Sequence, residues 1–195
     1  FLDYDVIRST DKEFWGFSDL STLINAIYTK TGRPSWLYQI RKLANREMIP
    51  YFENIAFGRE DYCCGLPREA VRFVRGTSMS GTVLGGNIRC FMKLNGTEYF
   101  PDLTDKILVL ESLEGTEGLM TTLLWQYRQL GVFRKIRGLL IGTYTALEKE
   151  QGPDFITKLV LEAVDNPDLP IAKTERIGHK VDSYGLHIGD RIELG

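Results

Sequence analysis

The sequence predicts an α/β protein, because short apolar runs typical of strands alternate along it with segments of helical periodicity. Residues 107–110 and 138–142 are two such runs, of the kind buried on both faces of a parallel sheet. A helical stripe of apolar residues follows each run; Gly131 closes the first and Pro153 precedes the second. We therefore expect layered strands and helices with at least some parallel pairing.

Composition narrows the function classes. The chain has 195 residues, 43% of them hydrophobic, which is enough for a core in one domain or two small ones. A net charge of -2 gives no broad attraction to nucleic acid or to anionic membranes. No apolar run approaches the roughly 20 residues that span a bilayer. We expect a cytoplasmic protein with neither a nucleic acid nor a membrane as partner.

Three cysteines bear on cofactors and redox state. Cys63 and Cys64 are adjacent and Cys90 stands apart, a spacing that makes neither a disulfide framework nor a metal pair. We interpret all three as reduced, structural thiols. No metal and no cofactor is expected.

The first segment with chemical content is a strand, a tight turn and a helix. Residues 14–17 form an aromatic run typical of a buried strand, and Ser18 begins a pair of good helix N-cap types. Apolar residues then recur at helical spacing over residues 20–27. Gly32 provides a left-handed C-cap and Pro34 forbids continuation.

That context suits a nucleophile elbow, in which a sharp turn exposes a serine hydroxyl above a helix N-terminus. Ser18 would be the nucleophile and the N–H of Asp19 an oxyanion donor. The alternative is that Ser18 only caps the helix, since the Gly-x-Ser-x-Gly pattern fails at Leu20. Spacing alone leaves both interpretations open.

The stretch from Ser35 to Asp61 mixes aromatic and basic side chains, which could indicate a surface for stacking bases and binding phosphates. The stretch is short and the whole chain is slightly acidic, so nucleic-acid binding is disfavoured. A loop that shapes substrate specificity, or an ordinary solvated face, fits better.

Residues 76–86 are rich in glycine but lack the spacing of a phosphate-binding loop or a dinucleotide fingerprint. Two structures fit the next segment. Asn87 could cap a helix that runs to Asn95 and Gly96, or those last two residues could form the turn of a hairpin.

A carboxylate follows the strand at residues 107–110. Glu111 stands at its carboxyl end, where ligands of open α/β sheets gather. Glu114 and Glu117 lie close by, so spacing alone does not choose among the three, and a solvated acidic loop is the alternative.

Only two histidines are present. His179 follows Gly178 in a loop after a strand expected near residues 169–172. His187 lies in residues 185–194, where apolar and polar residues alternate around a Gly-Asp turn. That alternation predicts a terminal hairpin with His187 on its polar face.

Four segments together resemble the LD-carboxypeptidase family of serine peptidases, which includes muramoyltetrapeptide carboxypeptidases and microcin C self-immunity peptidases. They are Trp-Gly-Phe-Ser-Asp-Leu-Ser-Thr-Leu at residues 15–23, Gly-Gly-Asn at residues 85–87, Ile-Leu-Val-Leu-Glu at residues 107–111, and Gly-His at residues 178–179. The resemblance implies a triad of Ser18 as nucleophile, His179 as base and Glu111 as orienting group. It also implies a helix after Asn87, with Asp19, Gly85, Gly86 and Asn87 at the oxyanion or substrate site.

The family's fold implies that residues 1–50 end an N-terminal α/β domain carrying the nucleophile elbow. Residues 51–195 would be a C-terminal α/β domain supplying the glutamate and the histidine. The chain opens at Phe1 without an initiator methionine and resembles only the C-terminal part of the family's architecture. Because the family's second oxyanion donor lies upstream of that part, we expect a truncated chain whose own activity is open.

By the same resemblance, the expected reaction cleaves the amide bond between an L-centre and a terminal D-amino acid in a muropeptide, in peptidoglycan recycling. A homodimer is possible. Thr121 and Thr122 replace an Asp-Arg pair of many muramoyltetrapeptide relatives, and Ser112 replaces an Asp. These departures keep open a peptidyl-nucleotide hydrolase of the microcin C type. Two other classes also remain, an esterase of the α/β-hydrolase type and a binding module without activity.

Overall fold

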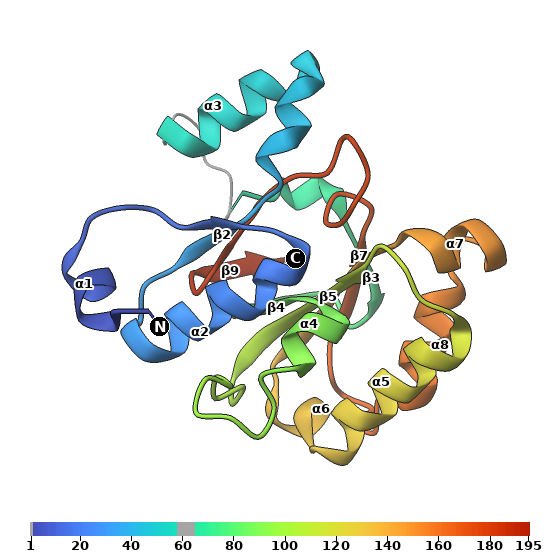
Figure 1. Cartoon of the computed structure of the whole chain (residues 1–195). Coiled ribbons are helices and arrows are strands. Elements are labelled where there is room, and N and C mark those ends of the chain that lie inside the picture. Colours follow the sequence, from blue (N-terminus) through green and yellow to red (C-terminus); the bar gives the residue numbers. More distant parts are fainter. Residues whose placement is uncertain (1, 58–64) are drawn as a thin grey trace.

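The structure of the chain is a computed structural model that describes residues 2–57 and 65–195 (Figure 1). Its centre is a six-stranded sheet of order β3-β7-β6-β5-β4-β9. The strands are β3 (Val71–Arg75), β4 (Met79–Asn87), β5 (Lys106–Ser112), β6 (Gly138–Tyr144), β7 (Ile171–Thr174) and β9 (Arg191–Leu194). The four inner strands run parallel, and the two edge strands run antiparallel to them. The predicted α/β class with parallel pairing is confirmed.

The inner strands are apolar because both faces of the sheet are covered. Every residue of β6 is buried, and so is every residue of β5 after Lys106. In the described ranges, eight helices connect or flank the strands. They are α1 (Tyr4–Ser9), α2 (Ser21–Thr31), α3 (Ile49–Phe57), α4 (Ile88–Met92), α5 (Glu117–Gln129), α6 (Val132–Lys135), α7 (Thr145–Gln151) and α8 (Phe155–Ala163). Helices α5 and α8 lie side by side over one part of the sheet (Figure 1).

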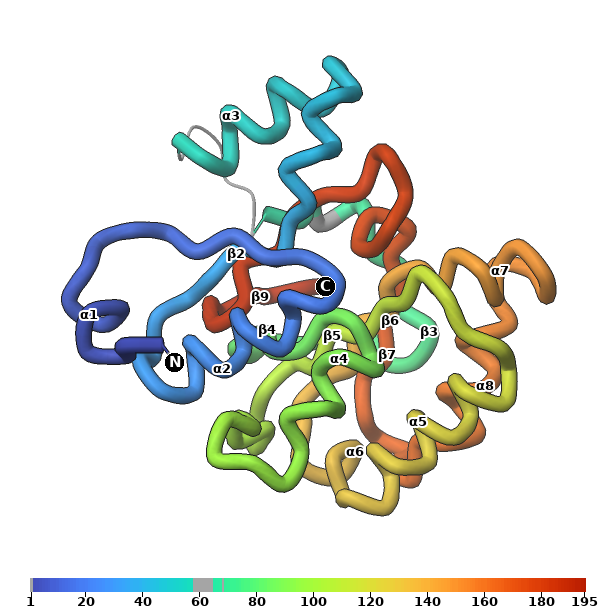
Figure 2. The backbone as a smooth tube through the Cα atoms, viewed as in Figure 1, coloured from blue at the N-terminus to red at the C-terminus, as the bar shows by residue number. Residues whose placement is uncertain are grey.

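A second, three-stranded sheet has the order β1-β2-β8. It contains β1 (Trp15–Gly16), β2 (Ser35–Leu37) and β8 (Leu186–Ile188). Strand β1 pairs in parallel with β2, and β8 pairs antiparallel with β2. The last segment of the chain therefore returns to the first, as the tube in Figure 2 shows. The division into domains at residue 50 stays a prediction.

Helix α2 is fixed to β4 by buried polar side chains. The amide of Asn25 donates to the carbonyl oxygen of Gly85 at 2.7 Å, and its oxygen accepts from the Gly85 N–H at 3.0 Å. The hydroxyl oxygen of Ser21 accepts from the Asn87 N–H, also at 3.0 Å. Asn25 and Ser21 are fully buried. Because buried polar groups need partners, these bonds fix the register of α2 against β4.

Several local predictions can be compared with the structure. A 3₁₀ turn at Ser18–Leu20 precedes α2, which ends at Gly32 with φ of 71°, the predicted left-handed C-cap. The side chain of Asn87 accepts from the Cys90 N–H and caps α4, so the helix start is confirmed and the hairpin is excluded. The helix ends at Met92, short of the predicted end at Asn95 and Gly96, and turns follow it. Cys90 is free and buried; Cys63 and Cys64 lie outside the described residues.

The predicted terminal hairpin is wrong. Strand β8 pairs with β2 and strand β9 pairs with β4, so the two strands flanking the Gly-Asp turn belong to different sheets. The N–H of Gly189 donates to the carbonyl oxygen of Val83 at 2.8 Å, which directs the turn into the larger sheet. An alternating pattern fixes which face is buried and leaves the pairing partner open.

Aromatic residues of β2 and of the segment after it form a small core of their own. Trp36, Tyr38 and Tyr51 are 6%, 2% and 6% exposed and pack with Met48 and with Ile55 of α3. No helix in the described ranges combines the length and the apolar character needed to cross a membrane.

Candidate active site

Ser18 lies in the backbone geometry of an elbow. Its φ is 53°, in the left-handed region that side chains other than glycine rarely adopt, and Phe17 before it is extended. The N-cap positions of the 3₁₀ turn and of α2 are occupied by Phe17 and Leu20, so Ser18 caps neither. Strained backbone of this kind gathers at functional sites, and a nucleophile elbow requires it. Helix capping therefore does not explain Ser18.

The carboxyl ends of the parallel strands lie close to this turn. Asn87 at the end of β4 is in register with Glu111 of β5. The loop that carries His179 follows β7, two strands further along the sheet. Open parallel sheets bind ligands at this edge.

Glu111 and His179 form a buried pair. The Nδ1 atom of His179 lies 2.7 Å from Oε2 of Glu111, and their side chains are 7% and 0% exposed. The atoms are close enough to bond, but the contact falls short of a well-aligned hydrogen bond. Catalytic hydrogen bonds are often poorly aligned before substrate binds. The two residues that the resemblance selected from distant segments are therefore in contact.

Ser18 and His179 are linked through a neighbour. The ring of His179 packs against the ring of Phe17, with centroids 4.6 Å apart. The Nε2 atom of His179 is buried and finds no hydrogen-bonding partner within the described ranges. The structure thus brings His179 and Glu111 into contact and places Ser18 directly after the residue that packs on His179, while the bond from Ser18 to His179 stays a prediction.

A cavity of about 390 Å³ opens at Ser18. Its walls come from the elbow, from the start of α4 and from the loop between β5 and α5. The lining residues are Ser18, Asp19, Asn87, Arg89, Ser112, Leu113, Glu114, Gly115, Thr116, Leu119 and Met120. His179 lines a second, separate cavity of about 170 Å³. Nowhere in the described residues do three metal-ligating side chains gather.

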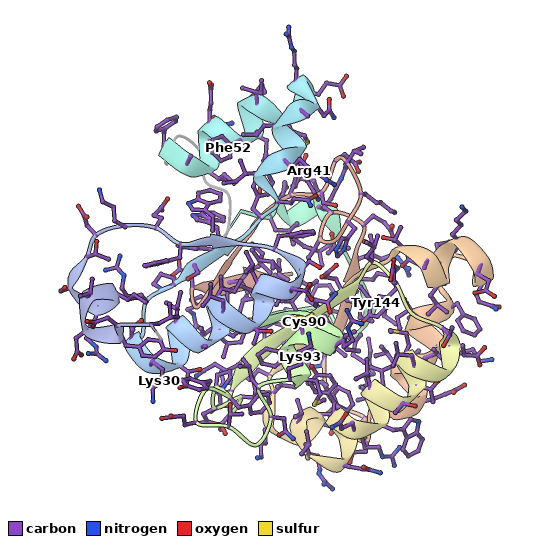
Figure 3. All side chains as sticks on the ribbon, viewed as in Figure 1. Lys30, Arg41, Phe52, Cys90, Lys93 and Tyr144 are labelled. Atoms are coloured by element: carbon purple, nitrogen blue, oxygen red, sulfur yellow. The ribbon has the colours of Figure 1, made fainter. Side chains whose placement is uncertain are left out.

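The side chain of Asp19 is engaged away from the serine. The thiol of Cys90 donates to its Oδ1 at 2.9 Å, and Nζ of Lys93 lies 3.9 Å away. The thiol's hydrogen bond, helped by the Lys93 charge, holds the pKa of Asp19 below its usual value. Cys90 lies in α4, and Lys93 directly follows that helix (Figure 3). Any oxyanion donor at Asp19 is therefore its backbone N–H, in the first turn of a helix, where such groups lack internal acceptors.

Gly85 and Gly86 lie behind the site. Their φ angles are 116° and 131°, and a Cβ on Gly86 would clash with the hydroxyl of Ser21 on α2. Gly86 thus lets β4 approach α2 closely, whereas a Cβ on Gly85 would clash with the carbonyl oxygen of Val109 on β5. The cavity wall beside Ser18 is formed by Asn87 instead. A direct part for the two glycines in substrate binding stays untested.

Two charged residues near the site were missed from the sequence. Arg89 is the single cation among the described residues lining the Ser18 cavity, and Lys42 is buried beside the histidine loop. Burial lowers the pKa of Lys42 to about 8, while the charges of Glu111 and Asp182 act in the opposite direction. Arg89 stands two residues after Asn87, so its closeness in sequence to a predicted site residue was a signal that could have identified it. Lys42 stands among exposed basic residues and carries no signal.

Comparison with known protein families finds two matches in the chain. Residues 80–194 match the LD-carboxypeptidase C-terminal domain, and residues 1–38 match the LD-carboxypeptidase N-terminal domain. The fold and the matched residues thus define a chain of the carboxypeptidase type. It belongs to the LD-carboxypeptidase family.

Two curated relatives are similar to the chain over almost its whole length. The chain is 28% identical to a Treponema pallidum protein named "Putative carboxypeptidase", over 99% of this chain and 64% of that protein. It is 21% identical to the microcin C7 self-immunity protein of Escherichia coli, over 100% of this chain and 66% of that one. The chain therefore spans less than two thirds of the length of both relatives.

Solved structures show the same fold. The microcin C7 self-immunity protein without ligand superposes with a TM-score of 0.83 at 19% identity, over 99% of this chain and 67% of that one. A muramoyltetrapeptide carboxypeptidase from Oxalobacter formigenes gives 0.75 at 19% identity, over 98% and 68%. At these identities the likeness establishes the fold.

Proposed function

We propose that the chain carries the catalytic residues of a serine LD-carboxypeptidase, which cleaves the amide bond between an L-centre and a terminal D-amino acid. One observation carries the proposal. A serine in strained elbow geometry directly follows Phe17, whose ring packs against the histidine of a buried histidine and glutamate pair, at the edge of the sheet where ligands bind.

In the first step, Nε2 of His179 takes the proton from Ser18 as its oxygen attacks the scissile carbonyl. Glu111 holds the imidazole through Nδ1 and stabilises the imidazolium that forms. The N–H of Asp19 donates to the developing oxyanion, and a donor of this kind is worth about 10² to 10³ in rate. His179 then returns the proton to the leaving amine, and water resolves the acyl-enzyme by the same route.

A carboxypeptidase must also recognise a free carboxylate. Arg89 is suited to that task, because its side chain is exposed at the cavity of Ser18 and forms no ion pair within the described residues. A guanidinium binds a carboxylate through two parallel hydrogen bonds. Arg89 would thus hold the terminal carboxylate of the substrate. The proposal includes three further points. The substrate is a muropeptide, the reaction takes place in the cytoplasm, and the protein forms a homodimer.

The test is labelling of Ser18 by a fluorophosphonate probe, together with mass analysis of a muropeptide tetrapeptide for lost D-alanine. We expect labelling in the wild type and its complete loss in Ser18→Ala. Ser78→Ala is the matched control, because Ser78 is exposed and lies outside the cavity. A probe attached elsewhere, or D-alanine release unchanged in Ser18→Ala, would remove the nucleophile assignment.

A peptidyl-nucleotide substrate is the second candidate. Thr121 and Thr122 stand where many muramoyltetrapeptide relatives carry an Asp-Arg pair, and one structural neighbour is described in complex with aspartyl sulfamoyl adenosine. That compound can therefore serve as a competitor of Ser18 labelling. Protection by it, with no protection by the muropeptide, would favour this candidate.

A further inference from the structure

Lys42 is a buried lysine that contacts both of the segments carrying Ser18 and His179. It lies in the 3₁₀ segment Ile40–Ala44, which leads from β2 towards α3, where Figure 3 marks the neighbouring Arg41. Lys42 is only 7% exposed, although lysine is among the residues most rarely buried. Taking an ammonium out of water is costly unless its contacts compensate, so those contacts matter.

The ammonium of Lys42 contacts the residue before the serine and the residue before the histidine. Its Nζ donates a hydrogen bond to the carbonyl oxygen of Gly178 at 2.8 Å. The same atom lies 5.2 Å from the centroid of the Phe17 ring, within the range of a cation–π interaction. One charged group therefore bridges the segments that carry Ser18 and His179.

The histidine loop is held from its other side by β6. Gly178 has φ of 137°, and a Cβ there would clash with the hydroxyl of Thr143. The N–H of Thr143 donates to the carbonyl oxygen of Ile177 at 2.8 Å. With Thr143 on one side and Lys42 on the other, the backbone before His179 is clamped in an unusual conformation.

The surroundings of Lys42 act on its pKa in two opposite directions. The carboxylates of Glu111 and Asp182 favour the ammonium, and burial opposes it more strongly, which leaves its pKa at about 8. His179 and the exposed Arg41 line the same small cavity as Lys42. The ammonium is therefore present below about pH 8 and is lost as the pH rises through that value.

We infer that Lys42 is a positioning residue, whose ammonium holds the Gly178 carbonyl and the Phe17 ring so that His179 and Ser18 meet. The inference rests on the proposed function for its catalytic consequence. The contact with the loop is independent of it. Displacing a catalytic group by about 1 Å costs roughly 10²-fold in rate.

The first arm measures hydrogen–deuterium exchange over residues 176–184 by mass spectrometry. Amide exchange reports local opening of the backbone. Lys42→Met removes a hydrogen bond from a charged donor, so the exchange rate of this segment should rise, roughly several-fold. Arg46→Met is the matched control, because it removes an exposed charge from the same stretch. Unchanged exchange in Lys42→Met would overturn the inference, whether or not the enzyme is active.

The second arm is the pH profile of Ser18 labelling, which a merely structural residue would not alter. In the wild type the rate should fall above about pH 8, as the ammonium loses its proton. Lys42→Met should be slow throughout, by roughly 10- to 100-fold, without that fall. Lys42→Arg stays charged, so its profile should lose the fall near pH 8. Identical profiles in the wild type and Lys42→Met would overturn the inference.

The outcomes stay separable. If Ser18 is not labelled in the wild type, the proposed function fails, and the exchange arm still decides whether Lys42 holds the loop. If Lys42→Met does not fold, wild-type exchange below and above the pKa of Lys42, corrected for intrinsic rates, replaces it. Equal corrected exchange at the two pH values would then count against the inference.

Discussion

The two histidines of the chain each approach a carboxylate at the same distance but in different surroundings, and only the contact of His187 with Asp190 has hydrogen-bond geometry. His179 approaches Glu111 and His187 approaches Asp190, in both cases with Nδ1 at 2.7 Å from a carboxylate oxygen. The partners of the first pair come from distant segments and are almost fully buried, whereas those of the second pair are three residues apart. A histidine and carboxylate contact is therefore not by itself a sign of catalysis.

Burial gives the same contact different consequences. The side chains of His179 and Glu111 are 7% and 0% exposed, against 17% and 47% for His187 and Asp190. Charges in a low-dielectric interior interact strongly, while water screens an exposed pair. His187 also stacks on Trp36, with ring centroids 4.3 Å apart. The first pair can thus orient a base, and the second supports a turn.

Removing each imidazole gives the largest expected difference. His179→Gln should slow Ser18 labelling by about 10² to 10⁴-fold, the usual contribution of a general base. His187→Gln keeps a side chain of similar size and should leave the rate within about twofold, since it touches no reacting group. The labelling rate at neutral pH checks both. Equal losses in the two variants would erase the distinction between the pairs.

Removing each carboxylate charge gives a smaller difference. Glu111→Gln keeps the shape and loses the charge that stabilises an imidazolium. In a triad the acid matters less than the base, so the rate should fall by about 10- to 10³-fold, less than for His179→Gln. Asp190→Asn is the matched control and should leave labelling unaltered. A rate in Glu111→Gln equal to that of the wild type would contradict the assigned role.

Parts of the site were predictable because local sequence determines them. An aromatic strand, then Ser18, then a periodic apolar helix predicts the elbow, and a wholly apolar run predicts that Glu111 lies at a strand's carboxyl end. The choice of Glu111 over Glu114 came from family resemblance. Spacing along the chain does not reveal which carboxylate a distant loop will reach.

Other parts depend on contacts that no local pattern contains. Lys42 sits in a run with Arg41 and Arg46, and it is buried where it contacts two distant segments, the histidine loop and Phe17. The alternation around His187 determined buried faces correctly, but each strand had an open edge in a different sheet to pair with. Tertiary pairing decided both cases.

Filling the space at Gly142, beside the pair of Glu111 and His179, should have an intermediate effect, and this effect is on stability. A Cβ on Gly142 would lie 2.9 Å from Cβ of Glu111 and 2.6 Å from the carbonyl oxygen of Ile177. Gly142→Ala should therefore lower the free energy of unfolding by roughly 1 to 3 kcal/mol, as overpacking does. Urea denaturation measures it.

Gly118→Ala is the control for that substitution. Gly118 lies in α5, and a Cβ there would meet nothing within 4 Å. Alanine in an open helical position should raise the free energy of unfolding by about 0.5 to 1 kcal/mol. If Gly142→Ala were as stable as the wild type, the pair of Glu111 and His179 would not be tightly enclosed.

The partly exposed pair of His187 and Asp190 gives the smallest effect. Asp190→Asn removes the carboxylate beside His187 and keeps the stack on Trp36, so it isolates the contact between carboxylate and imidazole. Exposed pairs contribute about 0 to 1 kcal/mol, and salt screens them. The free energy of unfolding should therefore fall by no more than about 1 kcal/mol at low salt, and by less at high salt. A loss of several kcal/mol that persists at high salt would mean that the turn at Asp190 is as dependent on its pair as the buried site is, because screening cannot reach a charge enclosed by protein.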